Sequence, residues 1–189
     1  LLGMVVEMFQ CPSDGQSEFG HACRSRNSYT SNAGMGLLRK ELKPSHTPGM
    51  FYQNSSVKMR DILDGTSNTA GVSEIIKVAP GTQGDYRGVW SYPEGMHYQH
   101  DNTPNSSIAD EIRTSLCDSS DPADPMAPCV GTFAAHDSRA INMAARSRHP
   151  GGVLVMMMDG SVQFVSSTVN LDTWQGLGTP AGHEVLGEY

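Results

Sequence analysis

The dipeptide Asp159-Gly160 constrains this chain most, because it lies between two short segments with strand character. Residues 153–158, VLVMMM, are apolar and few enough for a buried strand, and residues 161–165, SVQFV, alternate polar and apolar side chains. Asp and Gly both tolerate the positive φ angles that a tight hairpin turn needs. The segment therefore predicts a β-hairpin.

Within this hairpin, strand alternation should place Met157 on the face opposite to Met156 and Met158. If both faces are apolar, both are covered: one by an N-terminal helix, the other by loops or a neighbouring subunit. His149 precedes the first strand and Asp159 follows it, so up to roughly 33 Å of extended chain would separate them. We therefore expect His149 to bond backbone at the hairpin base, and the two residues to be separate structural fixtures.

The spacing of His149, Asp159 and Gly160, with SRHPGG before the hairpin and NLDTW after it, resembles the prepilin-type processing-associated H-X9-DG family. Two further stretches fit: QCPSD at 10–14, and DILDGTSNT at 61–69 ahead of a strand and Glu74. The resemblance implies a pilin-like or pseudopilin-like protein, with an N-terminal leader, a long apolar helix and a head built on a β-sheet. The family is itself a domain of unknown function, so the resemblance implies no particular activity.

Length and charge limit the functions that the chain can have. With 189 residues, the chain is expected to be one head domain over 1–189. Its net charge of −7 and its 13 thinly spread basic residues argue against nucleic-acid binding. The apolar start, residues 1–9, is too short to span a bilayer. If the family resemblance holds, residues 1–8 are the last turns of the apolar helix or the first strand of the head, and most of that helix is absent from this chain.

The four cysteines suggest an oxidising compartment. Cys11 and Cys23 are twelve residues apart, and so are Cys117 and Cys129, so two local disulfides are predicted. Three pairings remain open for four cysteines, and reduced buried thiols are the alternative. The tight C-x2-C spacing of zinc sites does not occur in the sequence.

Oxygen-bearing side chains crowd one short stretch, where Asp61, Asp64, Thr66, Ser67 and Asn68 could line a small loop. Such oxygens could hold calcium, the only cofactor that the sequence leaves open. The same residues are equally typical of Asx and Ser/Thr turns that cap backbone groups, and this second interpretation is preferred.

Aromatic and amide side chains gather between residues 81 and 107. They could form a subunit contact or a glycan-binding surface, because rings supply rigid contact area and amides supply adaptable hydrogen bonds. Alternatively, the rings pack back onto the sheet, above all Trp90. The residues concerned are Trp90, Tyr92, His97, Tyr98 and His100.

Catalytic motifs are missing from the sequence: it contains no H-E-x-x-H, nucleophile elbow, P-loop or dinucleotide fingerprint. His136, Asp137, His149, Asp159 and His183 have no spacing typical of a catalytic or metal cluster. The chain is therefore expected not to be an enzyme, and a metal-dependent enzyme that uses His149 is the third alternative.

We expect an α+β fold: a twisted, mostly antiparallel sheet with few short helices and many loops. Expected strands cover 27–32, 70–78, 86–92, 153–158 and 161–165, and expected helices cover 34–42 and 171–177, the last capped by Asn170 or Asp172. The expected function is a structural subunit of an extracellular pilin-like filament or surface assembly, exported by a pilus or type II secretion-like route. Expected partners are copies of itself, other pilin-like subunits or surface glycans; a carbohydrate-binding module is the alternative function.

Overall fold

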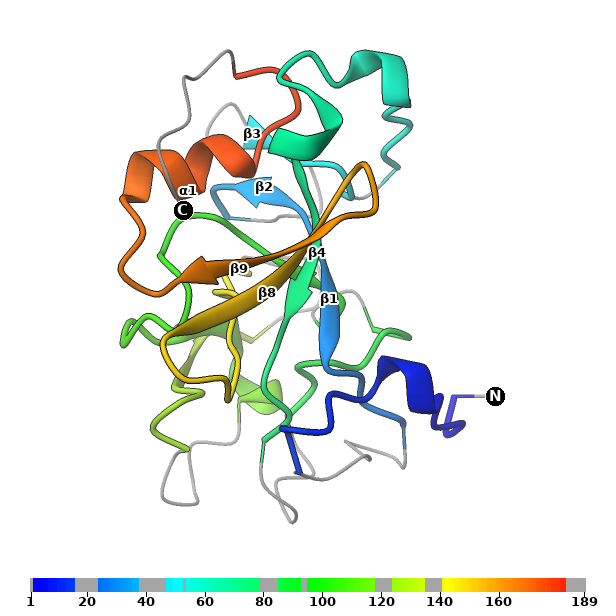
Figure 1. Ribbon diagram of the computed structural model, residues 1–189. Coiled ribbons are helices and arrows are strands. Elements are labelled where there is room, and N and C mark those ends of the chain that lie inside the picture. Colours follow the sequence, from blue (N-terminus) through cyan, green and yellow to red (C-terminus); the bar gives the residue numbers. More distant parts are fainter. Residues whose placement is uncertain are drawn as a thin grey trace.

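The computed structural model (Figure 1) describes residues 2–15, 24–37, 47–52, 54–78, 85–92, 95–117, 124–134 and 141–182. Its centre is a five-stranded sheet in the order β5-β1-β4-β8-β9. These strands are β1 (Tyr29–Asn32), β4 (Ala70–Glu74), β5 (His97–Tyr98), β8 (Gly152–Met157) and β9 (Val162–Ser166). Only β5 runs parallel to its neighbour β1, so the sheet is mostly antiparallel and the predicted α+β class is confirmed.

Two small sheets flank this centre. β2 (Gly34–Met35) pairs with β3 (Thr47–Pro48), and β6 (Asp110–Arg113) pairs in parallel with β7 (Cys129–Phe133). Single turns of 3-10 helix also occur among the described residues: η1 (Glu7–Phe9), η3 (Met59–Asp61), η4 (Thr66–Asn68) and η6 (Thr114–Leu116). None of the helices in the described ranges has the length and apolar character needed to cross a bilayer.

The predicted hairpin is confirmed as β8 and β9, with Val153 opposite Val165 and Leu154 opposite Phe164. Its turn differs from the primed two-residue type, because Met157 N–H donates to the Ser161 carbonyl across a three-residue loop. In that loop only Gly160 has a positive φ, 87°. Gly160 thus allows the chain to reverse, while the Asp159 carboxylate accepts hydrogen bonds from the Ser161 amide and hydroxyl.

The main core lies between one face of this hairpin and α1 (Leu171–Leu177), which crosses above it in Figure 1. Asn170 begins α1 as predicted, accepting the amide hydrogens of Asp172 and Thr173 on its side chain. Burial of the apolar side chains in this layer is the main force that holds the sheet and helix together. These side chains are Val153, Val155, Met157, Val165, Trp174 and Leu177.

Several predicted elements are wrong. Residues 86–92 form successive turns rather than a strand: Gly88 has a φ of 82°, and the amides of Val89 and Tyr92 donate to carbonyls three residues earlier. The predicted helix at 34–42 begins instead as β2, and residues 38–42 lie outside the described ranges. The predicted strand 70–78 ends at Glu74: the last residue pair of β4 with β1 is Glu74 with Tyr29, and the last with β8 is Ser73 with Val155. The N-terminal residues form turns and η1, neither the end of a long helix nor a strand.

Candidate functional site

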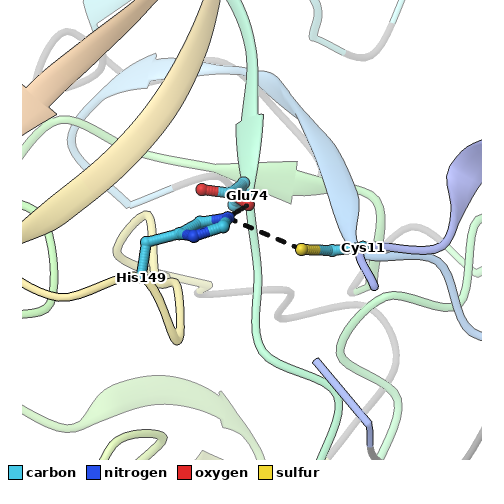
Figure 2. Close-up of side chains that lie close together, drawn as sticks. All are labelled: Cys11, Glu74 and His149. Atoms are coloured by element: carbon cyan, nitrogen blue, oxygen red, sulfur yellow. Dashed lines mark hydrogen bonds and ion pairs between the residues drawn. The ribbon is translucent and has the colours of Figure 1, made fainter. Parts of the chain in front are cut away.

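Three reactive side chains from distant parts of the chain converge at one end of the sheet (Figure 2). His149 Nε2 lies 3.2 Å from Glu74 Oε1 and 3.6 Å from Cys11 Sγ. One ligand atom from each residue lies within 4.8 Å of the other two, and no other group of three His, Cys, Asp or Glu residues in the described ranges meets that condition. We call Cys11, Glu74 and His149 the Cys-Glu-His cluster.

Each member of the cluster is held by backbone contacts. Glu74 is the last residue of β4, and its Oε2 accepts the Leu154 amide hydrogen of β8 at 2.7 Å. The Cys11 amide donates to the Ser28 hydroxyl at 2.9 Å, just before β1. The His149 amide donates to the Ser147 hydroxyl at 3.1 Å in the loop before β8. The cluster therefore ties the N-terminal segment to the ends of three strands.

A neighbouring ion pair reinforces the same junction. Arg148 Nε lies 3.1 Å from Asp14 Oδ1, and its Nη2 also pairs with Asp124. The other oxygen of Asp14 accepts the Lys77 amide hydrogen at 2.9 Å. Residues 11–14 are thus linked to the segment that follows β4 and to the loop that precedes β8.

The cluster is mostly buried, with one side of His149 open to solvent. Cys11 and Glu74 are buried, while 28% of the His149 side chain is exposed. Burial raises the pKa of the Cys11 thiol, and the negative charge of Glu74 raises that pKa further. Tyr29 is paired with Glu74 across β1 and β4. Its pKa is raised by burial and by the negative charges of Cys11 and Glu74.

The contacts do not form a nucleophilic triad. In such a triad the acid binds one ring nitrogen of His and the nucleophile binds the other. Here Glu74 and Cys11 both approach Nε2 of His149. The arrangement is instead a convergence of a sulfur, a nitrogen and an oxygen on one small volume. The predicted backbone bond of the His149 ring is therefore wrong: the ring nitrogen contacts the carboxylate and thiol.

Asp159 and Gly160 lie at the far end of β8, in the hairpin turn, as expected for separate fixtures. There the Asp159 amide donates to the Thr66 carbonyl at 3.1 Å, and the Met158 amide donates to the Thr69 carbonyl at 2.9 Å. Hydrogen bonds from Ser161 lower the pKa of the Asp159 carboxyl. The stretches 10–14 and 61–69 thus each contact one end of the His149–Asp159 segment.

The stretch proposed for calcium uses its oxygens within the protein. Asp61 accepts the Lys58 amide hydrogen at 2.8 Å, and Asp64 accepts that of Gly182 at 2.7 Å. The Asn68 side chain donates to the Asp64 carbonyl at 3.1 Å. Thr66 begins η4, and its backbone carbonyl accepts the Asp159 amide hydrogen. These contacts are those expected from the capping interpretation.

Most of the predicted aromatic surface is buried. His97 and Tyr98 form β5, and both are buried, as is His100, whose ring stacks on Trp174 at 4.0 Å between ring centroids. These three residues therefore cannot form an open glycan-binding loop. Trp90 is the exception at 39% exposure: it packs on Phe9 and donates its indole N–H to the Tyr29 carbonyl. Tyr92 is partly buried against Tyr86.

The predicted cysteine pairs have different outcomes. Cys117 and Cys129 form a disulfide, with their Cα atoms 5.9 Å apart. Cys11 is a free thiol, so the predicted bridge to Cys23 is wrong for this structure, because Sγ of Cys11 faces His149 instead. Cys23 lies outside the described residues, as do His136, Asp137 and His183.

The hairpin also presents an apolar surface to solvent. On the face opposite α1, Met156 pairs with Val162 and Leu154 pairs with Phe164. Met156, Val162 and Phe164 are 39%, 62% and 49% exposed. We call these four residues the outer hairpin face. The Phe164 ring lies against Gly152, where an added Cβ would come within 2.7 Å of the ring, so only glycine leaves room for it.

Sequence reasoning did not assign Glu74 to any site and placed Cys11 in a disulfide. Glu74 sits 63 residues after Cys11 and 75 residues before His149, so no local spacing could connect them. The signals in the sequence were a carboxylate within a segment rich in β-branched residues and its place after the 61–69 stretch that fits the H-X9-DG resemblance.

A family model described as "Protein of unknown function (DUF1559)" matches residues 3–172. The chain belongs to this family. The DUF1559 match includes the whole Cys-Glu-His cluster and both strands of the hairpin, and it ends just inside α1. Neither the curated proteins nor the solved structures contain a match to the chain.

Proposed function

We propose that this DUF1559 chain is a non-catalytic structural subunit of an extracellular pilin-like or pseudopilin-like filament or surface assembly. The observation that carries the proposal is the outer hairpin face, which exposes Met156, Val162 and Phe164 on the last strand pair of the sheet. Large apolar side chains clustered on an exposed sheet face are typical of an interaction surface.

The edge strand itself supports the proposal. The Met157 amide donates to the Ser161 carbonyl, and the Ser167 amide donates to the Gly151 carbonyl. By alternation, the amide and carbonyl groups of Val162 and Phe164 point away from β8. β9 contains neither a charged residue nor proline, the features that usually protect an edge strand from pairing with another chain.

A second copy of the chain is the proposed occupant of this surface. A filament needs a heterologous contact, in which the outer hairpin face of one subunit meets a different patch of the next. The Cys117–Cys129 disulfide is compatible with export to an oxidising compartment. The resemblance of His149, Asp159 and Gly160 to the H-X9-DG signature favours export by a pilus or type II secretion-like route, with other pilin-like subunits as further partners.

The test is electron microscopy of the protein isolated from its native cell surface, as wild type and as Val162→Lys and Phe164→Lys variants. Each lysine should reduce assembly, because it places a charge in an apolar contact. Ile108→Lys is the matched control, since Ile108 is also a well exposed apolar residue, at 59%, but is not part of the outer hairpin face. Circular dichroism should show the same fold in all variants. Monodisperse monomers from native wild-type material would overturn the proposal, as would unchanged assembly of both hairpin variants.

One observation supports glycan binding as a second candidate function. The exposed Trp90 borders a shallow groove that is also lined by Leu2, Met4 and Phe9. Aromatic rings of this kind can stack on sugar rings. Loss of glycan-array binding in Trp90→Ala would favour this second function, and an array without any bound glycan for wild type would remove it.

A further inference from the structure

The Cys-Glu-His cluster has the dimensions of a tetrahedral metal site. In a zinc site with Zn–S near 2.3 Å and Zn–N and Zn–O near 2.0 Å, tetrahedral angles separate S from N by about 3.5 Å and N from O by about 3.3 Å. The corresponding separations here are 3.6 Å for Cys11 Sγ to His149 Nε2 and 3.2 Å for His149 Nε2 to Glu74 Oε1. All three ligand atoms lie within 4.8 Å of one another, so small side-chain adjustments would let one ion contact all three.

The geometry points to a zinc-class divalent metal site formed by Cys11, Glu74 and His149, which clamps the N-terminal segment to the sheet. The side chains shown in Figure 2 approach this point from three separate elements: the segment after η1, the end of β4 and the loop before β8. A metal ion there would join the N-terminal segment, which is not part of the sheet, to the paired strands β4 and β8.

The donor set selects the class of ion. Calcium and magnesium prefer sites made entirely of oxygen, whereas a thiolate and an imidazole favour zinc and chemically similar ions. A thiolate, a carboxylate and a neutral imidazole together carry two negative charges, which a divalent cation neutralises. On binding, the Cys11 thiol loses its proton to solvent and a metal–sulfur bond forms in its place.

The surroundings support coordination. Glu74 Oε2 is occupied by the Leu154 amide, which orients the carboxylate and leaves Oε1 directed at the cluster. Such hydrogen bonds to a ligand are the usual support of metal sites. The 28% exposed side of His149 gives solvent access, so an ion can enter and a water molecule can supply the fourth ligand.

Cobalt(II) is the probe for the test, because tetrahedral cobalt with a thiolate ligand has visible d–d bands and a near-ultraviolet sulfur-to-metal band. The full chain, freed of metal with a chelator, should bind one cobalt ion per chain with both signals, and zinc should displace it. Cys11→Ser should lose the sulfur band, and Glu74→Gln and His149→Gln should weaken binding about tenfold or more. Glu74→Gln keeps an acceptor for the Leu154 amide, so it separates loss of a ligand from loss of the fold.

Two controls exclude other ligands. Cys23→Ser removes the other unassigned cysteine of the sequence and should leave the cobalt spectrum unchanged. Tyr29→Phe alters a neighbour of the cluster that is not a proposed ligand, and it should also bind cobalt normally. Melting curves of each metal-free variant show whether the fold is retained.

Three results would overturn the site. The first is the absence of a tetrahedral cobalt spectrum in the folded wild-type chain. The second is a spectrum that depends on Cys23 and not on Cys11. The third is peptide mapping that finds Cys11 in a disulfide, which would remove its thiolate. None of these results bears on filament assembly, so this inference and the proposed function can fail separately.

Discussion

Asp110 and Arg146 form a buried ion pair in which Asp110 Oδ1 lies 2.9 Å from Arg146 Nη2, and each side chain is only 1% exposed. The second oxygen of Asp110 lies 2.9 Å from Arg87 Nη1, and Arg87 in turn pairs with Asp85 at 2.8 Å. The buried charges alternate in sign along this chain of contacts. Burial by itself would lower the pKa of the Arg87 guanidinium, but Asp85 and Asp110 outweigh that effect and raise it.

Asp110→Ala should destabilise the protein by roughly 3–5 kcal/mol, because it leaves two buried guanidinium groups with less compensation. Urea unfolding followed by circular dichroism measures this change in the free energy of unfolding. Arg60→Ala is the control: Arg60 and Asp61 are an exposed pair 3.8 Å apart, and such pairs contribute less than about 1 kcal/mol. Equal effects of the two substitutions would contradict the buried network.

Removal of the Cys117–Cys129 disulfide should cost about 3 kcal/mol, because the bridge closes a short loop and restricts the unfolded chain. The comparison is the melting temperature of the Cys117→Ser/Cys129→Ser double variant with that of wild type. Added reductant should bring wild type close to the variant and leave the variant unchanged. A wild type insensitive to reductant would show that the bridge does not contribute.

Stability should fall in mild acid because of His100. Burial lowers the pKa of His100 from 6.5 to about 3, so the folded protein keeps the ring neutral while the unfolded chain protonates it. The unfolded state therefore binds the additional proton between these values, and the stabilisation present above pH 6.5 is lost as the pH falls toward 3. Between pH 7 and pH 5 this single group should account for a loss of about 2 kcal/mol.

The His100 contribution can be isolated with His100→Gln. In the fold, Nδ1 lies 2.6 Å from the Trp174 carbonyl and Nε2 lies 3.2 Å from the Tyr98 hydroxyl, contacts that an amide can partly replace without titrating. Urea unfolding at pH 7 and pH 5 should show a smaller difference for the variant than for wild type. The same difference in both proteins would assign the acid sensitivity to other groups.

Asn170→Ala should destabilise the protein by about 1 kcal/mol, because the Asn170 side chain accepts two amide hydrogens at the start of α1. Asn170→Asp keeps an acceptor at this position and should remain close to wild type. Thermal unfolding of the three proteins provides the comparison, and equal melting temperatures would show that the cap is unimportant.

The elements that the sequence predicted well are those specified by neighbouring residues. The β8–β9 hairpin follows from alternation on either side of Asp159-Gly160, and α1 follows from its Asn170 cap. The strand predicted at 86–92 rested on the strand propensity of its aromatic residues and valine, and it was wrong. Close packing decides the conformation of this segment instead: Gly95 lies so near the turn that a Cβ there would be 2.1 Å from the Tyr86 carbonyl oxygen.

Residues close together in the chain were sufficient to predict the α+β class, the hairpin and the helix that follows it. They did not decide the cysteine pairing, because the same twelve-residue spacing predicted one bridge that forms, Cys117–Cys129, and one that does not, Cys11–Cys23. Only the folded domain reveals that Cys11 meets Glu74 and His149, and that Tyr98 and His100 are buried beneath Trp174. Such contacts form when the sheet brings distant segments together and excludes water between them. That step depends on packing over the whole domain, so no short pattern of residues encodes it.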